Sequence, residues 1–173
     1  MYYSTTHPSS VGLITLASDS TSLVGLWLEG QKYHGQSIPE VMTEKSDLPI
    51  FDQAKHWLDR YFAGTKPAIK ELPLAPIGSA FRQSVWSILC EIPYGKVITY
   101  GEIAKKLGVK SSQAVGGAVG HNPISIIIPC HRVVGANGSL TGYAGGVQTK
   151  IRLLELEGVD VTKLFLPKKG TAL

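Results

Sequence analysis

The first third of the chain carries two apolar runs that are typical of β-strands. Residues 11–18 (VGLITLAS) and 22–30 (SLVGLWLEG) contain partly alternating apolar positions, and the polar residues DST separate them. Two such runs joined by a short polar turn predict a β-hairpin. From residue 50 onward the apolar spacing changes to that of an amphipathic helix, which Gly64 ends. The apolar positions of this helix are Phe51, Ala54, Trp57, Leu58, Tyr61 and Phe62.

Prolines then mark a change in organisation. The segment 66–78 (KPAIKELPLAPIG) contains three prolines, which predicts a linker between two domains, residues 1–74 and 75–173. After this segment, apolar residues return at helical spacing until Pro93 and Gly95 end a further helix. We therefore expect an α/β protein of the α+β kind. A small sheet-and-helix domain is followed by a mostly helical domain.

Two short helices are expected next. Thr99 and Glu102 have the spacing of a capping box, so that a helix begins at Tyr100. Either Ser111 or Ser112 would cap the helix that follows. Two helices joined by a tight, glycine-containing turn form a helix-turn-helix pattern, although most such helix pairs bind nothing.

The second of these helices is unusually rich in glycine. Gly116, Gly117 and Gly120 each lower helix stability by about 1 kcal/mol relative to alanine. Glycine is useful at such positions when something approaches the helix backbone closely. Either another segment of the protein or the backbone of DNA would fit this description.

Composition and charge narrow the class of protein. A chain of 173 residues with 43% hydrophobic and 17% charged residues is ordinary for a soluble globular protein. No apolar stretch is long enough to span a bilayer and the N-terminus lacks the pattern of a signal peptide, so a cytoplasmic location is expected. The two cysteines form no C-x-x-C pair, which argues against a disulfide framework or a zinc knuckle. The net charge of +4 and the pI near 9.0 are compatible with nucleic-acid binding.

The stretch 124–135 (ISIIIPCHRVVG) carries the candidate chemistry. Its apolar run predicts a buried strand that is followed at once by Cys130, His131 and Arg132. A cysteine acts as a nucleophile only as the thiolate, which a neighbouring base or cation must stabilise. Because neighbouring side chains of an extended segment point to opposite faces, a water molecule is the expected link between thiol and imidazole. The alternative is a structural cysteine that happens to precede a histidine.

A carboxylate on the last predicted helix strengthens the catalytic interpretation. In the helix over residues 149–158, Glu157 falls between two leucines on the apolar side. A carboxylate in such surroundings needs a partner to offset its desolvation, and His131 is the candidate. This predicts a relay from Glu157 through His131 and a water molecule to Cys130. The alternative is that Glu157 is exposed at the helix end, and the residues alone do not distinguish an acyl from an alkyl carbon as the target.

Several motifs together closely resemble the O6-methylguanine-DNA methyltransferases. They are IPCHRVV, preceded by AVGGAVGHNP and followed by TGYAGG and LLELEG, and also VWSILCEIPYGKVITYGEIA. The resemblance is dense over residues 79–158 and only general before them. It implies a direct-reversal DNA-repair protein that binds duplex DNA containing O6-alkylguanine, in the minor groove, and flips the damaged base into a pocket. It also implies a monomer with no cofactor and no membrane partner.

The resemblance assigns roles to individual residues. Cys130 would accept the alkyl group, His131 would act as base through a water molecule, and Glu157 would hold His131. Asn122 would brace the structure beneath the cysteine, and Tyr100 would assist flipping and donate a hydrogen bond to the leaving guanine. Because a thioether is too stable to be hydrolysed here, each molecule would act once and be inactivated. The remaining substrate- or DNA-binding residues would be Gln113, Ala114, Gly117, Tyr143, Ala144 and Arg132, although the residues alone give Arg132 only a structural role.

The chain departs from the family pattern at two places. Gln113 stands where relatives typically carry an arginine that fills the space left by the flipped base, and glutamine lacks the charge and stacking surface of a guanidinium. Lys110 is a nearby cation that could serve instead. Some relatives hold zinc in the N-terminal domain, but this domain has no cysteine, so no metal is expected. The contribution of Lys168 and Lys169 stays open between a DNA contact and a solvated end.

Three rival functions remain for comparison. A non-catalytic lesion-binding relative would lack the acceptor cysteine, so Cys130 argues against it. A plain helix-turn-helix regulator would explain the basic charge but neither PCHRV nor Glu157. A cysteine hydrolase would use the same Cys–His–Glu set, but it would need an oxyanion hole and would turn over.

Overall fold

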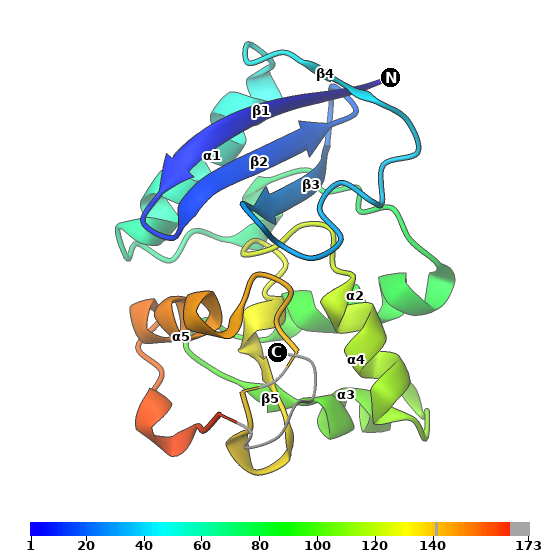
Figure 1. Ribbon diagram of the computed structural model, residues 1–173, viewed down its shortest axis with the longest axis vertical. Helices are drawn as coiled ribbons and strands as arrows, with labels where there is room; N and C mark the ends of the chain where they lie inside the picture. The colour runs from blue at the N-terminus through cyan, green and yellow to red at the C-terminus, as the bar shows by residue number, and fades with distance from the viewer. Residues whose placement is uncertain (141, 167–173) are drawn as a thin grey trace. The chain divides into compact units, whose positions relative to one another are not determined.

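The computed structural model describes residues 1–140 and 142–166, so Lys168 and Lys169 lie outside the described residues. The chain divides into two compact units, each of which is described by itself (Figure 1). The first comprises Met1–Gly78 with Pro123–Ile127, and the second comprises Ser79–Asn122 with the chain from Ile128 onward. The expected fold class, a small sheet-and-helix part followed by a mostly helical part, is confirmed.

A four-stranded sheet forms the centre of the first unit. Its order is β3-β2-β1-β4, with β4 parallel to β1 and the other pairs antiparallel. Strands β2 and β3 are the predicted hairpin, whereas β1 and β4 were not expected. Only Thr5 of β1 is fully buried and no residue of β4 is, so neither strand has an apolar alternation to detect. The strands are β1 (Tyr2–Ser9), β2 (Gly12–Ser18), β3 (Leu23–Leu28) and β4 (Met42–Glu44).

Helix α1 (Pro49–Phe62) packs along this sheet (Figure 1). The predicted stripe is buried apart from Phe62, which is partly exposed. The proline-containing segment, expected as a linker, packs on β3 after a 3-10 turn, η1 (Ile69–Glu71). Leu23 donates its N–H to Pro73 and accepts one from Ala75, both at 2.8 Å. The missing N–H groups of the prolines are not needed in this pairing, because Pro73 contributes only its carbonyl.

The second unit combines helices with a short parallel pair of strands. The indole N–H of Trp86 on α2 donates to the Ala118 carbonyl on α4 at 2.9 Å, which joins these two helices. In the part of the chain that the structure describes, no helix has both the length and the apolar character needed to cross a membrane. The elements are α2 (Ala80–Glu91), β5 (Ile98–Thr99), α3 (Tyr100–Leu107), α4 (Ser112–Gly120), η2 (Cys130–Arg132), β6 (Val133–Val134), η3 (Ala136–Gly138), α5 (Val147–Leu156) and η4 (Val161–Lys163).

Both helices of the predicted helix-turn-helix begin at their expected caps. The Thr99 hydroxyl accepts from the Glu102 N–H at 3.1 Å, and the Glu102 carboxylate accepts from the Thr99 N–H at 3.3 Å, which completes the capping box. Ser111 rather than Ser112 caps α4, because its hydroxyl accepts from the Ala114 N–H at 3.1 Å. The start of each helix is therefore set by local sequence.

The apolar run before Cys130 is not the strand that its sequence predicts. Ile124 makes a single bridge to Leu26 of β3, and the chain then turns through Ile126, whose φ is +70°. Every residue of the run is nevertheless buried. A continuous apolar run indicates burial but not an extended backbone, so a buried turn gives the same pattern.

This turn is an excursion of the chain from one unit into the other. Residues 123–127 belong to the first unit, where their backbone pairs with Leu26 at 2.8 and 3.0 Å. The flanking residues Asn122 and Ile128 belong to the second unit. The Asn122 side-chain amide donates to the Ile128 carbonyl at 2.8 Å, and this hydrogen bond joins the two residues between which the segment 123–127 leaves and returns. Cys130 lies two residues after Ile128.

The two serines at the start of α4 offer a matched test of the cap. We expect Ser111→Ala to lower the free energy of unfolding by about 1 kcal/mol, because an N–H at the helix start loses its acceptor. Ser112→Ala, at the exposed first helical position, should change it by only a few tenths of that value. Urea unfolding followed by circular dichroism measures both. Equal losses for the two variants would contradict the assignment of the cap.

Candidate active site

Cys130 opens a buried 3-10 turn rather than following a strand. The turn η2 is closed by the Arg132 N–H, which donates to the Pro129 carbonyl at 3.0 Å. Its three side chains therefore point about 120° apart, and the alternation expected for an extended segment does not apply. The next two residues form β6, which pairs with β5 immediately before α3. This pairing ties the cysteine turn to the first residue of α3, Tyr100.

His131 and Glu157 form a fully buried pair. The distance between His131 Nε2 and Glu157 Oε2 is 2.6 Å, and neither side chain is exposed. Glu157 is the residue that caps the C-terminal end of α5. The expected contact between these side chains is thus present, and the alternative of an exposed Glu157 is excluded.

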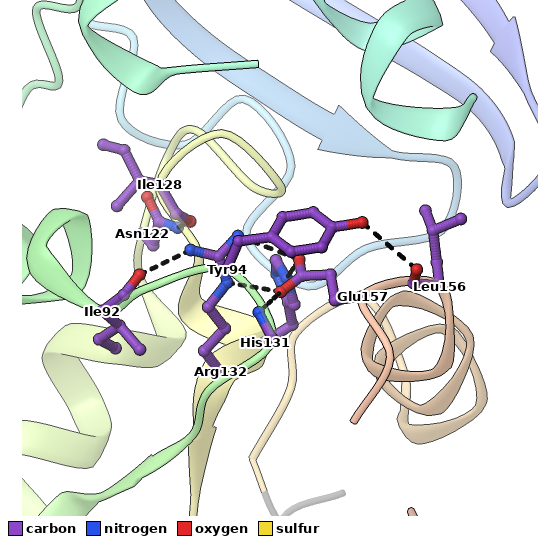
Figure 2. A network of polar contacts seen from close by, with 9 residues as sticks. Ile92, Tyr94, Asn122, Ile128, His131, Arg132, Leu156 and Glu157 are labelled. Carbon is purple, nitrogen blue, oxygen red and sulfur yellow. Dashed lines mark hydrogen bonds and ion pairs between the residues drawn. The ribbon is translucent and has the colours of Figure 1, made fainter. Parts of the chain in front are cut away.

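The Glu157 carboxylate accepts hydrogen bonds from several donors (Figure 2). Besides His131, the donors include Arg132 Nε at 2.7 Å, Arg132 Nη2 at 3.1 Å and the Gly95 N–H at 3.2 Å. Burial raises the pKa of Glu157, but the hydrogen bonds and charges of His131 and Arg132 outweigh it and hold the pKa at about 2. Glu157 is therefore a carboxylate throughout the physiological range.

Because Glu157 is ionised, it can only accept, so the proton in this pair lies on Nε2 of His131. Burial lowers the pKa of His131, and the charges of Arg132 and Lys150 lower it further, whereas Glu157 raises it. The ring is therefore neutral near pH 7 and its Nδ1 is unprotonated. Among the described residues, this buried Nδ1 has no hydrogen-bond partner. It is an available proton acceptor inside the protein.

The Cys130 thiol rests in its protonated form. Burial raises the pKa of Cys130, while a hydrogen bond from Asn122 and the charge of Lys150 partly offset that effect. Asn122 also donates to the Ile128 carbonyl, so a single side chain supports both the cysteine and the backbone two residues before it. A buried thiol of this kind needs a base before it becomes a nucleophile.

Tyr100 and Tyr143 lie on the side of the site formed by α3, α4 and the loop before α5. A Cβ atom on Gly142 would lie 3.0 Å from the Tyr100 hydroxyl, and one on Gly116 of α4 would lie 3.9 Å from the Tyr100 ring. Tyr143 is buried, and its hydroxyl has no partner among the described residues. Burial raises the pKa of Tyr143 well above its usual value, and the negative charge of Glu157 adds to this effect. Ala144 beside it is partly exposed.

The residues expected at the DNA form a separate, exposed group on α4. Gln113, Ala114 and Gly117 are all exposed. Their spacing of one and four residues places them on one side of the helix. A Cβ atom on Gly117 would meet no described heavy atom within 4 Å. The 3.9 Å between a Cβ atom on Gly116 and the Tyr100 ring is an ordinary van der Waals distance, so close approach of the described chain requires glycine at neither position 116 nor position 117.

Two buried cations complete the site. The Arg132 side chain is 7% exposed and directed at Glu157, although it was grouped with the residues that contact substrate or DNA. Lys150 was not expected at all; its ammonium donates to the Val133 carbonyl, and burial lowers its pKa to about 8. The sequence did indicate that Lys150 is buried, because it lies seven residues before Glu157 and therefore on the same face of α5.

Two family models together match almost the whole chain. The one described as 6-O-methylguanine DNA methyltransferase, DNA binding domain, matches residues 80–159, and the one described as 6-O-methylguanine DNA methyltransferase, ribonuclease-like domain, matches residues 1–76. The chain belongs to the 6-O-methylguanine DNA methyltransferase family. Its second unit therefore corresponds to the part of the family that is described as DNA-binding.

Individual members of the family are similar along most of their length. A methylated-DNA–protein-cysteine methyltransferase of Haemophilus influenzae is 44% identical over 161 residues, which cover 92% of this chain and 87% of the relative. One of Methanosarcina acetivorans is 47% identical over 160 residues, covering 91% and 99%. The crystal structure of Mycobacterium tuberculosis O6-methylguanine methyltransferase matches with a TM-score of 0.80 at 42% identity, covering 91% and 93%. A structure of the M. tuberculosis OGT in complex with DNA matches at 0.79 and 41%, covering 94% of each chain.

The protonation state of His131 can be observed directly. We expect ¹⁵N NMR of the histidine rings to show Nε2 protonated and Nδ1 unprotonated at pH 7, with a titration midpoint below the ordinary value of 6.5. Glu157→Gln removes the negative charge that raises the pKa of His131, so the midpoint should fall further. The resonance is assigned by its loss in His131→Gln. A midpoint above 6.5 in the unaltered protein would contradict this description of the pair.

Proposed function

We propose that the protein transfers the alkyl group from O6 of guanine in duplex DNA to the sulfur of Cys130 and is inactivated by doing so. As a member of the 6-O-methylguanine DNA methyltransferase family, the chain is a methylated-DNA–protein-cysteine methyltransferase that acts in DNA repair. The proposal adds the acceptor residue, the flipped base, the single turnover, a monomeric state and a cytoplasmic location.

The observation that carries the proposal is the buried Glu157–His131 pair with an unpartnered Nδ1, next in sequence to Cys130. Through a bridging water, Nδ1 takes the thiol proton, and the carboxylate stabilises the imidazolium that forms. The thiolate then attacks the alkyl carbon. The S–C bond forms as the C–O bond breaks, and the electron pair leaves on guanine, to which Tyr100 donates a hydrogen bond.

The surroundings of the cysteine suit the other proposed roles. Asn122 braces the turn through its bond to Ile128, which supports the position of the sulfur. The unpartnered hydroxyl of buried Tyr143, with Ala144 beside it, is suited to line a pocket for a flipped guanine. A thioether has no route back to the thiol by hydrolysis, so the transfer happens once per molecule.

The exposed face of α4 is the proposed DNA contact. Gln113, Ala114 and Gly117 lie there with no part of the described chain against Gly117. An open glycine allows the sugar-phosphate backbone to approach the helix closely. The M. tuberculosis relative in complex with DNA, which covers 94% of this chain, supports the same partner here. Gln113 would occupy the space of the flipped base.

The acceptor residue can be identified by mass. After incubation with duplex DNA that contains O6-methylguanine, the peptide with Cys130 should gain one methyl group, and the amount should saturate at one per protein molecule. Cys130→Ser should gain none. Cys90→Ser should gain the same as the unaltered protein, since the half-buried Cys90 lies outside the proposed site.

The three rival functions predict different results in this experiment. Repeated turnover without a modified peptide would indicate a hydrolase. Tight binding without transfer would indicate a regulator or a lesion-binding protein.

The role of Gln113 is tested by restoring an arginine. We expect Gln113→Arg to tighten binding to methylated duplex or to speed the transfer, because a guanidinium adds charge and a stacking surface where the base has left. Ser112→Arg adds the same charge at the neighbouring exposed position. It should tighten binding by about one phosphate contact and steepen the salt dependence, but leave the transfer rate at saturating DNA unchanged. Single-turnover rates on methylated duplex distinguish the two. Equal rates for Gln113→Arg and the unaltered protein would count against the finger role.

A further inference from the structure

We propose that Arg132 is a positioning residue for the transfer: it fixes the Glu157 carboxylate so that Glu157 accepts the Nε2 proton of His131 without taking it, which leaves Nδ1 free to act as the base. The proposal rests on the proposed function, because it concerns the same base and the same thiol. It assigns the third member of the Cys130–His131–Arg132 turn, to which the residues alone give only a structural role.

The first observation is the number of ways in which the guanidinium is held. Its Nε and Nη2 bind the two oxygens of Glu157 side by side, at 2.7 and 3.1 Å. Its Nη1 donates to the Ile92 carbonyl at the end of α2, at 2.7 Å. Its Cζ lies 5.6 Å from the centre of the Tyr94 ring (Figure 2). A planar fork held at both carboxylate oxygens fixes the orientation of the carboxylate as well as its position.

The second observation is how His131 and Arg132 share the carboxylate. Oε2 of Glu157 accepts from both His131 Nε2 and Arg132 Nη2, and Oε1 accepts from Arg132 Nε and the Gly95 N–H. The hydroxyl of Tyr94 also donates to the Leu156 carbonyl at 3.3 Å, which attaches the turn after α2, where Tyr94 and Gly95 lie, to the end of α5. The imidazole therefore meets a carboxylate whose plane is already fixed by its other donors.

The third observation is the charge balance around His131. A buried imidazole beside a lone carboxylate would gain a proton readily, since the ion pair favours imidazolium. Protonation would place hydrogen on both ring nitrogens and leave no acceptor at Nδ1. The positive charge of Arg132 opposes this protonation and lowers the pKa of His131. Burial is the largest effect that lowers the pKa of His131, and Arg132 adds to it, while Arg132 together with His131 also keeps Glu157 ionised.

Other titratable groups act on this cluster and are left unchanged by the test. They are Lys150 on α5, Cys130 on η2, and the tyrosines Tyr94 and Tyr143. Lys150 has a pKa of about 8, so its titration affects the alkaline side of a pH profile. The acidic limb of the pH–rate profile reports the pKa of the base. A shift of that limb when Arg132 is replaced is therefore assigned to His131.

The test compares Arg132→Gln and Arg132→Lys with the unaltered protein and with Arg152→Gln as a control. Arg152 is an exposed residue of α5 outside the site, so its replacement removes the same charge without touching Glu157. The single-turnover rate of methyl transfer is measured on O6-methylguanine duplex from pH 5 to 8, at saturating DNA. The His131 ring is titrated by ¹⁵N NMR in the free proteins.

For Arg132→Gln we expect the rate at neutral pH to fall about 10- to 100-fold, the scale seen when the group that orients a metal-binding histidine is removed. The acidic limb of the rate profile and the NMR midpoint of His131 should both move upward by on the order of one pH unit. Arg132→Lys keeps the charge and should restore the midpoint while restoring the rate only in part, since an ammonium cannot span both oxygens. Arg152→Gln should match the unaltered protein.

A merely structural Arg132 would lower stability without moving the His131 midpoint, and that result would overturn the proposal. If Arg132→Gln does not fold, Arg132→Lys decides: an unchanged rate would overturn the proposal, and a lowered rate with an unchanged midpoint would support it. Failure of the proposed function has a different signature, because the unaltered protein would then gain no methyl group on Cys130.

Discussion

The hydrogen-bonded carboxylate of Glu157 is the group on which the arrangement of the site depends. Its donors come from the turn after α2 and from the turn that contains Cys130, and Glu157 itself ends α5. Three segments far apart in the sequence therefore meet at one pair of oxygen atoms (Figure 2). Gly95 shows how close this meeting is, since its φ is +79° and a Cβ atom there would lie 3.0 Å from the Glu157 carbonyl oxygen. Only glycine accommodates both constraints without strain.

Such a network is poorly explained as a device for stability. Removing a carboxylate and a guanidinium from water costs several kcal/mol per ion, and well-packed apolar residues of similar volume are often as stabilising. The network does determine protonation states. His131 and Arg132 keep Glu157 charged, while burial and the charge of Arg132 keep His131 neutral against the opposing effect of Glu157. This is the condition under which one imidazole nitrogen donates and the other accepts. On the proposed mechanism, the free energy spent on burying these charges serves the chemistry of Cys130.

The sequence predicted best those features that depend on neighbouring residues. The capping box at Thr99 and the burial of Glu157 follow from spacing within a single helix, and both are present in the structure. The same helical wheel places Lys150 on the buried face of α5 that also carries Glu157, so its burial was accessible to the same reasoning. The environment of Arg132 was not, because its carbonyl partner on Ile92 lies 40 residues away and no local pattern encodes that contact. Likewise, the run of isoleucines indicated burial but could not reveal that residues 123–127 leave one unit and pair with a strand of the other.

On the proposed mechanism Cys130 reacts only once, so it must not be consumed by the wrong reagent, and its resting state meets this requirement. Burial keeps the sulfur as a thiol, and a thiol reacts far more slowly than a thiolate with oxidants and free alkylating agents. The neutral His131 ring supplies a base without placing a permanent positive charge beside the sulfur, which would have favoured the thiolate at all times. On the proposed mechanism, the base His131 and the thiol of Cys130 are therefore both in place, but the thiolate is consumed only when a bound alkylguanine can react with it. On the proposed mechanism, the burial that keeps His131 neutral therefore also keeps the sulfur of Cys130 in its less reactive form.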